Sequence, residues 1–177
     1  MKKIIFLVLA GLLLNSVVAF GNDPQIIENT PSEKNIKSSN GFGAQLWLTD
    51  DQEYLKKWNQ PTERFFFHPL HSVLRGKPVF VIVLFAGQPG INDKNLCDIT
   101  VDIIVKTPDG KIYGEQKNGD CWQSLPIPPT QEIQLCNSSM GIVIEENDQS
   151  GRYAVEAIIK DKIKNTELTL EQYFDVK

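Results

Sequence analysis

Residues 98–110 read DITVDIIVKTPDG, and this stretch decides the fold class. Its apolar side chains alternate with polar ones, as in a β-strand that buries one face. The face predicted to be buried carries Ile99, Val101, Ile103 and Val105. The face predicted to meet water carries Asp98, Thr100, Asp102 and Lys106. The stretch therefore predicts a half-buried strand over residues 98–107.

The end of that stretch predicts a tight turn. Pro108 and Gly110 stand where proline and glycine are favoured in a type I turn that closes a hairpin with a glycine bulge. A return strand should follow over residues 111–117. Its alternation is polar, which indicates a strand at the edge of a sheet.

Further strands are expected on both sides of this hairpin. Residues 78–85 (PVFVIVLF) are apolar on both faces and too short for a buried helix, so they predict a central strand. The other predicted strands span residues 44–48, 65–67, 141–145, 153–160 and 168–176. About seven short strands, with turns about 8 to 12 residues apart, predict an all-β domain over residues 44–177, an antiparallel sandwich. A barrel is the alternative.

One short helix is expected near the start of this domain. Residues 49–52 (TDDQ) match the capping box, in which a Thr hydroxyl and a Gln side chain satisfy each other's backbone donors. The helix should run over residues 50–59 and end before Pro61. Acidic residues suit the positive end of a helix dipole, so we interpret Asp50 and Asp51 as capping residues rather than ligands.

The N-terminus predicts export. Two lysines precede an apolar run over residues 4–14, and small residues at 17 and 19 have the spacing of a signal-peptidase site. We expect a signal peptide over residues 1–21. A membrane anchor is the competing interpretation, but about eleven apolar residues are fewer than the roughly 20 that span a bilayer. Residues 22–43 then predict a flexible leader, and the mature protein should be periplasmic or secreted, with no membrane span.

The composition argues against two other classes of protein. Of the 177 residues, 41% are apolar and 23% are charged, which is typical of a globular domain rather than a disordered chain. The 18 basic and 22 acidic residues give a net charge of -4, and cleavage after the two N-terminal lysines makes the chain more acidic. An acidic chain disfavours nucleic acid and anionic membrane surfaces as partners.

Residues 148–153 (DQSGRY), at the entry to a strand that should pair with the last one, resemble the tyrosine corner of immunoglobulin-like sandwiches. The resemblance covers roughly residues 76–177 and implies that Tyr153 buries its ring and bonds its hydroxyl to upstream backbone. In antibody-type domains a Cys follows two residues later, but Val155 stands there in this chain. The pattern is also similar to that of small secreted bacterial sandwich proteins of unassigned function. It implies a fold and no chemistry.

Three cysteines remain after export, and they predict one disulfide and one thiol. If Thr107 lies opposite Lys111, the hairpin register places Cys97 across from Cys121, so we favour that pair and leave Cys136 free. A bulge would shift the register, and the polar return strand requires either a bulge or an edge position. The chain contains no C-x-x-C motif, so the cysteine spacing does not indicate a metal site.

No group of residues predicts catalysis. His68 and His71 could share a metal with Asp50 or Asp51, but their neighbours are apolar and no third ligand is specified. No G-x-S-x-G motif is present, and no Gly-Lys-Ser/Thr follows the loop over residues 87–90. We therefore predict a protein that is not an enzyme, with no catalytic, cofactor-binding or metal-binding residues.

Two functions from different classes remain. The first is an interaction module that binds a protein or a glycan. The alternative is an inhibitor of an enzyme such as a protease, with residues 124–130 (SLPIPPT) as the inhibitory loop, because its three prolines limit the entropy lost on binding. The loop is otherwise a rigid connection between strands. Trp122 is either an exposed anchor or is packed beside Cys121, and the sequence does not name the residues that bind a partner.

Overall fold

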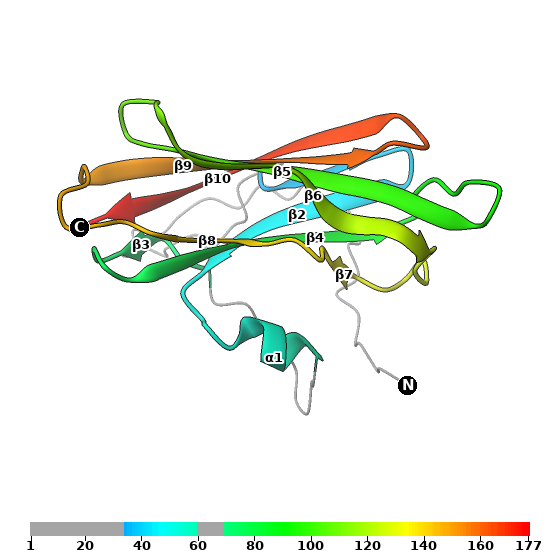
Figure 1. Ribbon diagram of the computed structural model, residues 1–177, viewed down its shortest axis with the longest axis horizontal. Helices are drawn as coiled ribbons and strands as arrows, with labels where there is room; N and C mark the ends of the chain where they lie inside the picture. Colours follow the sequence, from blue (N-terminus) through cyan, green and yellow to red (C-terminus); the bar gives the residue numbers. More distant parts are fainter. Residues whose placement is uncertain (1–33, 60–68) are drawn as a thin grey trace, which may run out of the picture.

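Residues 34–59 and 69–177, the part of the chain that this computed structural model describes, form two packed β-sheets (Figure 1). Sheet A contains β1 (Ile36–Ser39), β2 (Phe42–Thr49), β4 (Pro78–Gly87), β7 (Gln134–Leu135) and β8 (Met140–Val143). Sheet B contains, in order across the sheet, β3 (Ser72–Val73), β10 (Thr166–Val176), β9 (Gly151–Asp161), β5 (Leu96–Lys106) and β6 (Ile112–Pro126). Paired strands are antiparallel except that β3 runs parallel to β10. The predicted all-β sandwich is confirmed.

Strand β4 is central in sheet A, as its two apolar faces predict. It lies between β2 on one side and both β7 and β8 on the other. Val79, Val81 and Val83 face the space between the sheets and are fully buried. Ile82 and Leu84 face the other way and form a second apolar cluster with the helix α1 (Tyr54–Asn59). The largest aromatic side chains that fill the space between the sheets are Phe42, Phe85, Tyr153 and Phe174.

Strand β5 buries the face that its alternation predicts. The four apolar residues of that face, Ile99, Val101, Ile103 and Val105, are all fully buried. The expectation that Thr100 and Asp102 meet water is wrong, because neighbouring strands cover them. Asp102 accepts hydrogen bonds from Lys160 Nζ at 2.5 Å and from Asn118 N at 2.7 Å. A charge-assisted hydrogen bond therefore accompanies the burial of this carboxylate.

The turn between β5 and β6 has the predicted geometry. Gly110 N donates to Thr107 O at 2.9 Å, and Thr107 N donates to Lys111 O at 2.8 Å. Gly110 has a φ of 83°, in the left-handed region that a glycine enters without strain. Strand β6 lies at the edge of sheet B, as predicted.

The predicted disulfide between Cys97 and Cys121 is wrong: Cys121 is bonded to Cys136, and Cys97 is a free, buried thiol. The register that starts correctly at the turn does not persist, because four shifts interrupt the pairing of β5 with β6. Leu96 consequently pairs with Pro126 and Asp98 with Gln123, so the part of β6 opposite Cys97 lies beyond Cys121.

The sandwich begins before the expected boundary at residue 44. Strand β1 pairs with β2 through a turn at Asn40 and Gly41, both of which have positive φ. The last part of the predicted leader, residues 36–43, therefore belongs to sheet A. The predicted signal peptide, residues 22–33 of the predicted leader and the strand expected over residues 65–67 lie outside the described residues.

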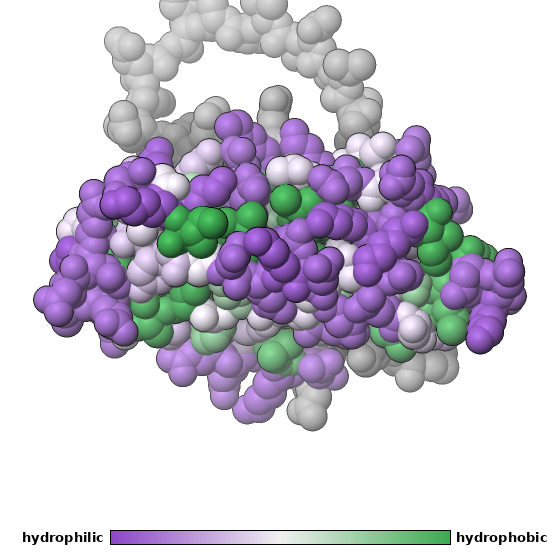
Figure 2. Space-filling view, turned by 45° about the horizontal axis from the view of Figure 1, so that its top comes forward, coloured by the Kyte–Doolittle hydropathy of each residue, from purple (hydrophilic) through white to green (hydrophobic). Residues whose placement is uncertain are grey.

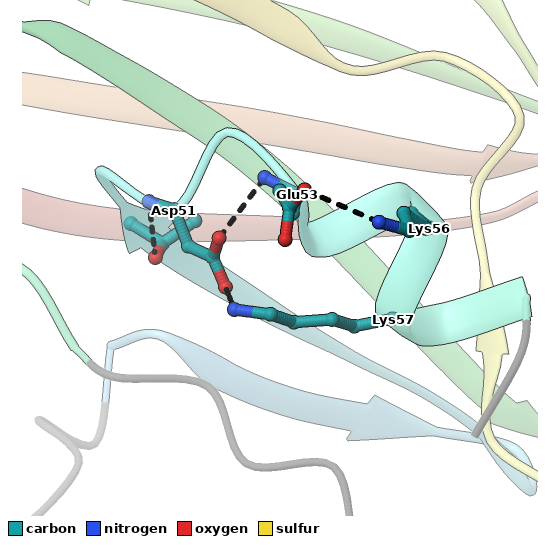
Figure 3. A network of polar contacts seen from close by, with 5 residues as sticks. Asp51, Glu53, Lys56 and Lys57 are labelled. Carbon is teal, nitrogen blue, oxygen red and sulfur yellow. Dashed lines mark hydrogen bonds and ion pairs between the residues drawn. The ribbon is translucent and has the colours of Figure 1, made fainter. Parts of the chain in front are cut away.

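Helix α1 begins at Tyr54, four residues later than predicted, and its cap is not the predicted capping box (Figure 3). Thr49 Oγ1 accepts a hydrogen bond from Asp51 N at 3.2 Å, and Asp51 Oδ1 accepts one from Glu53 N at 2.9 Å. Asp51 also forms an ion pair with Lys57 at 2.5 Å. Short side chains that bond backbone two residues ahead thus hold the turn, and Asp51 is a capping residue, as interpreted.

The tyrosine corner is confirmed. Tyr153 is fully buried, and its hydroxyl donates to Gln149 O at 2.9 Å. Its ring stacks on Phe174, with 5.4 Å between ring centroids, and meets Tyr113 edge-on at 5.6 Å. Arg75 extends the corner by donating to Asp148 O at 2.9 Å.

Within residues 34–59 and 69–177, no helix is long and apolar enough to cross a membrane.

Candidate functional site

The Cys121–Cys136 disulfide closes the connection between β6 and β7, and we call the enclosed residues 122–135 the proline loop. Both ends of this loop are fixed. Cys121 O accepts a hydrogen bond from Asn137 N at 3.0 Å, and Asp120 O accepts one from Ser138 N at 2.7 Å. Cys136 N donates to Val83 O of β4 at 2.9 Å. The disulfide therefore joins a strand of sheet B to a segment bonded to sheet A.

Internal contacts hold the proline loop between these ends. Trp122 Nε1 donates to Pro126 O at 2.8 Å, and its ring packs edge-on against Phe85 with 5.6 Å between centroids. Trp122 is thus partly buried and packs against the core, rather than being an exposed anchor. Pro129 O accepts a hydrogen bond from Glu132 N at 2.9 Å. Pro128 is buried, so it fixes the middle of the loop to the protein.

The exposed surface of residues 126–129 is apolar, and the exposed polar residues Ser124, Thr130 and Gln131 flank it. Ile127 is 41% exposed, and Pro126 and Pro129 beside it are also exposed. Residues 124–131 contain no charged side chain. A fixed loop that presents an aliphatic side chain between prolines offers a contact surface rather than reactive groups.

Two neighbouring connections at the same end of the sandwich are also fixed (Figure 1). The buried carboxylate of Asp161 accepts hydrogen bonds from the backbone N–H groups of Gly90 at 2.5 Å and of Ile163 and Lys164 at 3.0 Å. Gly90 fits there because a Cβ would lie 2.8 Å from Ile163 Cβ. Lys164 Nζ donates to Gln88 O at 2.6 Å. The β4–β5 connection and the β9–β10 turn therefore form one unit beside the proline loop.

Sequence reasoning missed Asp161 as an anchor, although its position just before a turn was a signal. An aspartate at the start of a turn commonly bonds the backbone two or three residues ahead. Its third bond, to Gly90, joins segments 71 residues apart and has no local signal. The end of the sandwich is thus rigid for reasons that the sequence reveals only in part.

The other residues considered in the sequence do not come together. His68 lies outside the described residues, and His71 is exposed, with its carbonyl accepting a hydrogen bond from Asp175 N at 2.9 Å. Asp50 is exposed, and Asp51 is engaged at the helix cap. No group of three or more His, Cys, Asp or Glu side chains within residues 34–59 and 69–177 is arranged to hold a metal ion.

The outer faces of the two sheets differ in character. On sheet A, the apolar cluster around Tyr54, Ile82 and Leu84 is joined by the partly buried side chains of Trp47, Trp58, Phe80, Ile133 and Leu135. Figure 2 brings the sheet B side of the molecule forward and shows a mainly hydrophilic surface with separate hydrophobic patches. Ile133 and Leu135 come from the proline loop, so one side of that loop continues the apolar cover of sheet A.

Comparisons with known proteins do not assign the chain to a family. No family model matches it, and no curated protein matches it. Among solved structures, it is similar to a Niemann-Pick type C2 protein from the Japanese carpenter ant, with 10% identity and a TM-score of 0.42 over 75% of this chain and 89% of the ant protein. It is also similar to a family 123 glycoside hydrolase from Clostridium perfringens, with 12% identity and a TM-score of 0.42 over 78% of this chain and 27% of the hydrolase.

Proposed function

We propose that this chain is an exported, non-enzymatic binding module that contacts a partner protein through the proline loop. The observation that carries the proposal is the exposure of Ile127 on a loop whose two ends are joined by a disulfide. A loop that is ordered before binding loses little conformational entropy when it binds. The same binding energy then yields a higher affinity than a mobile loop would give.

A protein fits this surface better than a glycan. Recognition of a sugar requires polar side chains that bond its hydroxyls, whereas the exposed residues in the middle of the loop are Pro126, Ile127 and Pro129, and the exposed polar residues Ser124, Thr130 and Gln131 lie on either side of them. Aliphatic side chains of this kind fill apolar pockets on proteins. Resemblance to immunoglobulin-like domains supports the use of an end loop, since variable domains of that class bind through loops at one end of the sandwich.

Export is the setting that this proposal requires. The predicted signal peptide sends the chain to an oxidising compartment, and a disulfide persists in such a compartment. Cys121 and Cys136 are both buried, which protects the bond from reducing thiols.

Inhibition of an enzyme is a second candidate, favoured by the closure of the loop. A stiff loop that enters the active site of a protease would block that enzyme without chemistry of its own. The disulfide and the three prolines of residues 124–130 supply the stiffness. This candidate differs from the first in the class of partner and not in the surface used.

A capture experiment with a matched control tests both candidates. Exported proteins from the producing cell would be passed over immobilised wild type, Ile127→Asp and Ile112→Asp. Ile112 is the matched control because it is 58% exposed and lies at the other end of β6. We expect a partner that wild type and Ile112→Asp retain and that Ile127→Asp loses. Equal retention by all three proteins would exclude the proline loop as the contact, and loss of protease activity from the flow-through would favour the inhibitor.

A further inference from the structure

We infer that the partner binds the proline loop as a polyproline-type segment, in an apolar groove lined by aromatic rings, and not as an added β-strand. This inference rests on the proposed function and names the chemistry of the partner. It follows from the backbone preferences, the hydrogen-bonding groups and the exposed side chains of residues 125–129.

The prolines favour an extended, polyproline-like backbone over residues 125–129, between the end of β6 at Pro126 and the turn that Pro129 O closes with Glu132 N. Each proline ring holds φ near -65°, which is the φ of a polyproline II helix. The residue before a proline is also driven away from helical conformations. Leu125, Ile127 and Pro128 each precede a proline, so every residue from 125 to 129 is restricted in one or both ways. The segment is therefore preformed in a conformation that polyproline-binding grooves accept at low entropic cost.

The loop lacks the hydrogen-bonding groups that a β-strand partner needs. Alternate residues of an added strand present N–H and C=O groups along the same edge. Pro126 and Pro128 would supply one edge, and neither has an N–H. Pro129 interrupts the other edge. Moreover, the carbonyls of Pro126 and Pro129 already accept hydrogen bonds from Trp122 Nε1 and Glu132 N.

Substrate-like binding in a protease cleft would use the same strand-type hydrogen bonds, so the loop suits that role poorly. What it offers instead is apolar surface: the exposed rings of Pro126 and Pro129 on either side of the exposed Ile127 side chain. Proline rings and aliphatic side chains pack well against aromatic rings, which supply large, rigid contact surfaces. The absence of charge over residues 124–131 means that the groove needs no charged side chains of its own.

The test is site-specific photo-cross-linking in cells that export the full protein. A diazirine-bearing aliphatic residue would replace Ile127 in one protein and Ile112 in a control. Each would be irradiated with and without an excess of polyproline peptide, and the cross-linked partner peptide would be identified by mass spectrometry. A further pair, Pro126→Ala and Pro129→Ala, would be made in the protein labelled at 127, with the intact disulfide and an unchanged circular dichroism spectrum as evidence of folding.

We expect cross-linking from 127 to a partner peptide that contains Trp, Tyr or Phe, competition by polyproline, and no such product from 112. Each alanine substitution should lower the yield about twofold to fivefold, because the free loop gains conformational freedom. A product from 127 that polyproline does not compete with, or that maps to a protease active site, overturns this inference and leaves a loop-mediated partner standing. Equal products from 127 and 112 would overturn the proposed function as well.

Discussion

The two ends of strand β6 are fastened by different means. At its start, the turn over residues 107–111 is held by hydrogen bonds between residues that are neighbours in the sequence. At its end, the proline loop is held by a disulfide between Cys121 and Cys136, 15 residues apart. Local chemistry determines the first end, and long-range contacts determine the second.

The two ends also differ in what surrounds their exposed isoleucines. Ile112 is more exposed than Ile127, at 58% against 41%, so exposure alone does not single out the proline loop. Ile112 is followed by a strand whose side chains include the Glu115–Lys117 ion pair, and it is preceded by the Asp109–Lys111 pair. Ile127 lies among prolines in an uncharged stretch. A single exposed aliphatic side chain among charges is ordinary surface, whereas an exposed apolar patch of two prolines and an isoleucine on a fixed loop is a candidate contact surface.

Removing the disulfide should have the largest effect on stability. The local loosening should be confined to the end of β6 that leads into the proline loop. We expect Cys121→Ala with Cys136→Ala to lower the free energy of unfolding by about 3 kcal/mol, because a closed loop of about 15 residues restricts the unfolded chain by that amount. Urea unfolding measures this loss. Hydrogen exchange should speed up over residues 122–135 and stay unchanged at the turn over residues 107–111.

Cys97→Ala is the control, because Cys97 is buried but forms no disulfide. It should cost about 1 kcal/mol through lost packing and leave exchange in the proline loop unchanged. Equal acceleration at both ends of β6 in the disulfide variant would contradict the view that the ends are held independently.

The sequence predicted the start of β6 better than its end for the same physical reason. Pro108 and Gly110 specify their turn through their own backbone preferences, so the turn was recognisable. The register beyond the turn depends on bulges in β6. Asn118 and Ser124 have positive φ in this part of the strand. An Asn-Gly pair at 118–119 is a local sign of such a bulge, but nothing in the sequence marks Ser124. The disulfide was therefore misassigned because the register shifts add up along the strand.

The candidate loop was predicted from its prolines, whereas its closure by a disulfide was not. Three prolines in residues 124–130 indicated stiffness from the sequence alone. The pairing of Cys121 with Cys136, the burial of Pro128 and the packing of Trp122 on Phe85 depend on how the two sheets meet. Long-range packing of this kind leaves no periodic pattern in a single sequence.

The tyrosine corner supports the start of β6, because the ring of Tyr113 packs on that of Tyr153. We expect Tyr153→Phe to lower the free energy of unfolding by about 1 kcal/mol, since the hydrogen bond from the Tyr153 hydroxyl to Gln149 O would be lost. Tyr173→Phe is the matched control, because its hydroxyl bonds Glu171 at the surface. That control should change stability by less than about 0.5 kcal/mol. Equal unfolding midpoints for the two variants would show that the corner bond contributes nothing.

The turn at residues 107–111 should respond to a change in backbone preference alone. Gly110 has a φ of 83°, and no atom lies within 4 Å of the position that a Cβ would take. Gly110→Ala should therefore lower the free energy of unfolding by about 1 kcal/mol. The cause would be that alanine disfavours the left-handed conformation, since the added Cβ would meet no other atom. Gly110→Asn should cost less, because Asn tolerates that conformation better. Thermal or urea unfolding measures both variants. If Gly110→Asn is less stable than Gly110→Ala, a side-chain contact at this turn, and not the backbone conformation, determines the cost.

The smallest effect should be a dependence on alkaline pH at the start of β6. The Tyr113 hydroxyl lies 2.8 Å from Val143 O and 2.7 Å from Asp148 Oδ2, and burial together with the bond to Asp148 raises the pKa of Tyr113 to about 12. A phenol in the unfolded chain ionises near pH 10. The neutral phenol therefore stabilises the fold fully below about pH 10, and this contribution is lost as the pH rises toward 12.

We expect urea unfolding between pH 9 and 11 to show a steeper loss of stability for wild type than for Tyr113→Phe, which has no phenol at this position to ionise. Both proteins retain Cys97 and the disulfide, so alkaline thiol exchange affects them equally. The proline loop contains no tyrosine, so its hydrogen exchange, corrected for the intrinsic rate, should not distinguish the two proteins over this pH range. Parallel stability curves would mean that the Tyr113 hydroxyl is not held in its neutral form, and that its hydrogen bonds do not stabilise the start of β6.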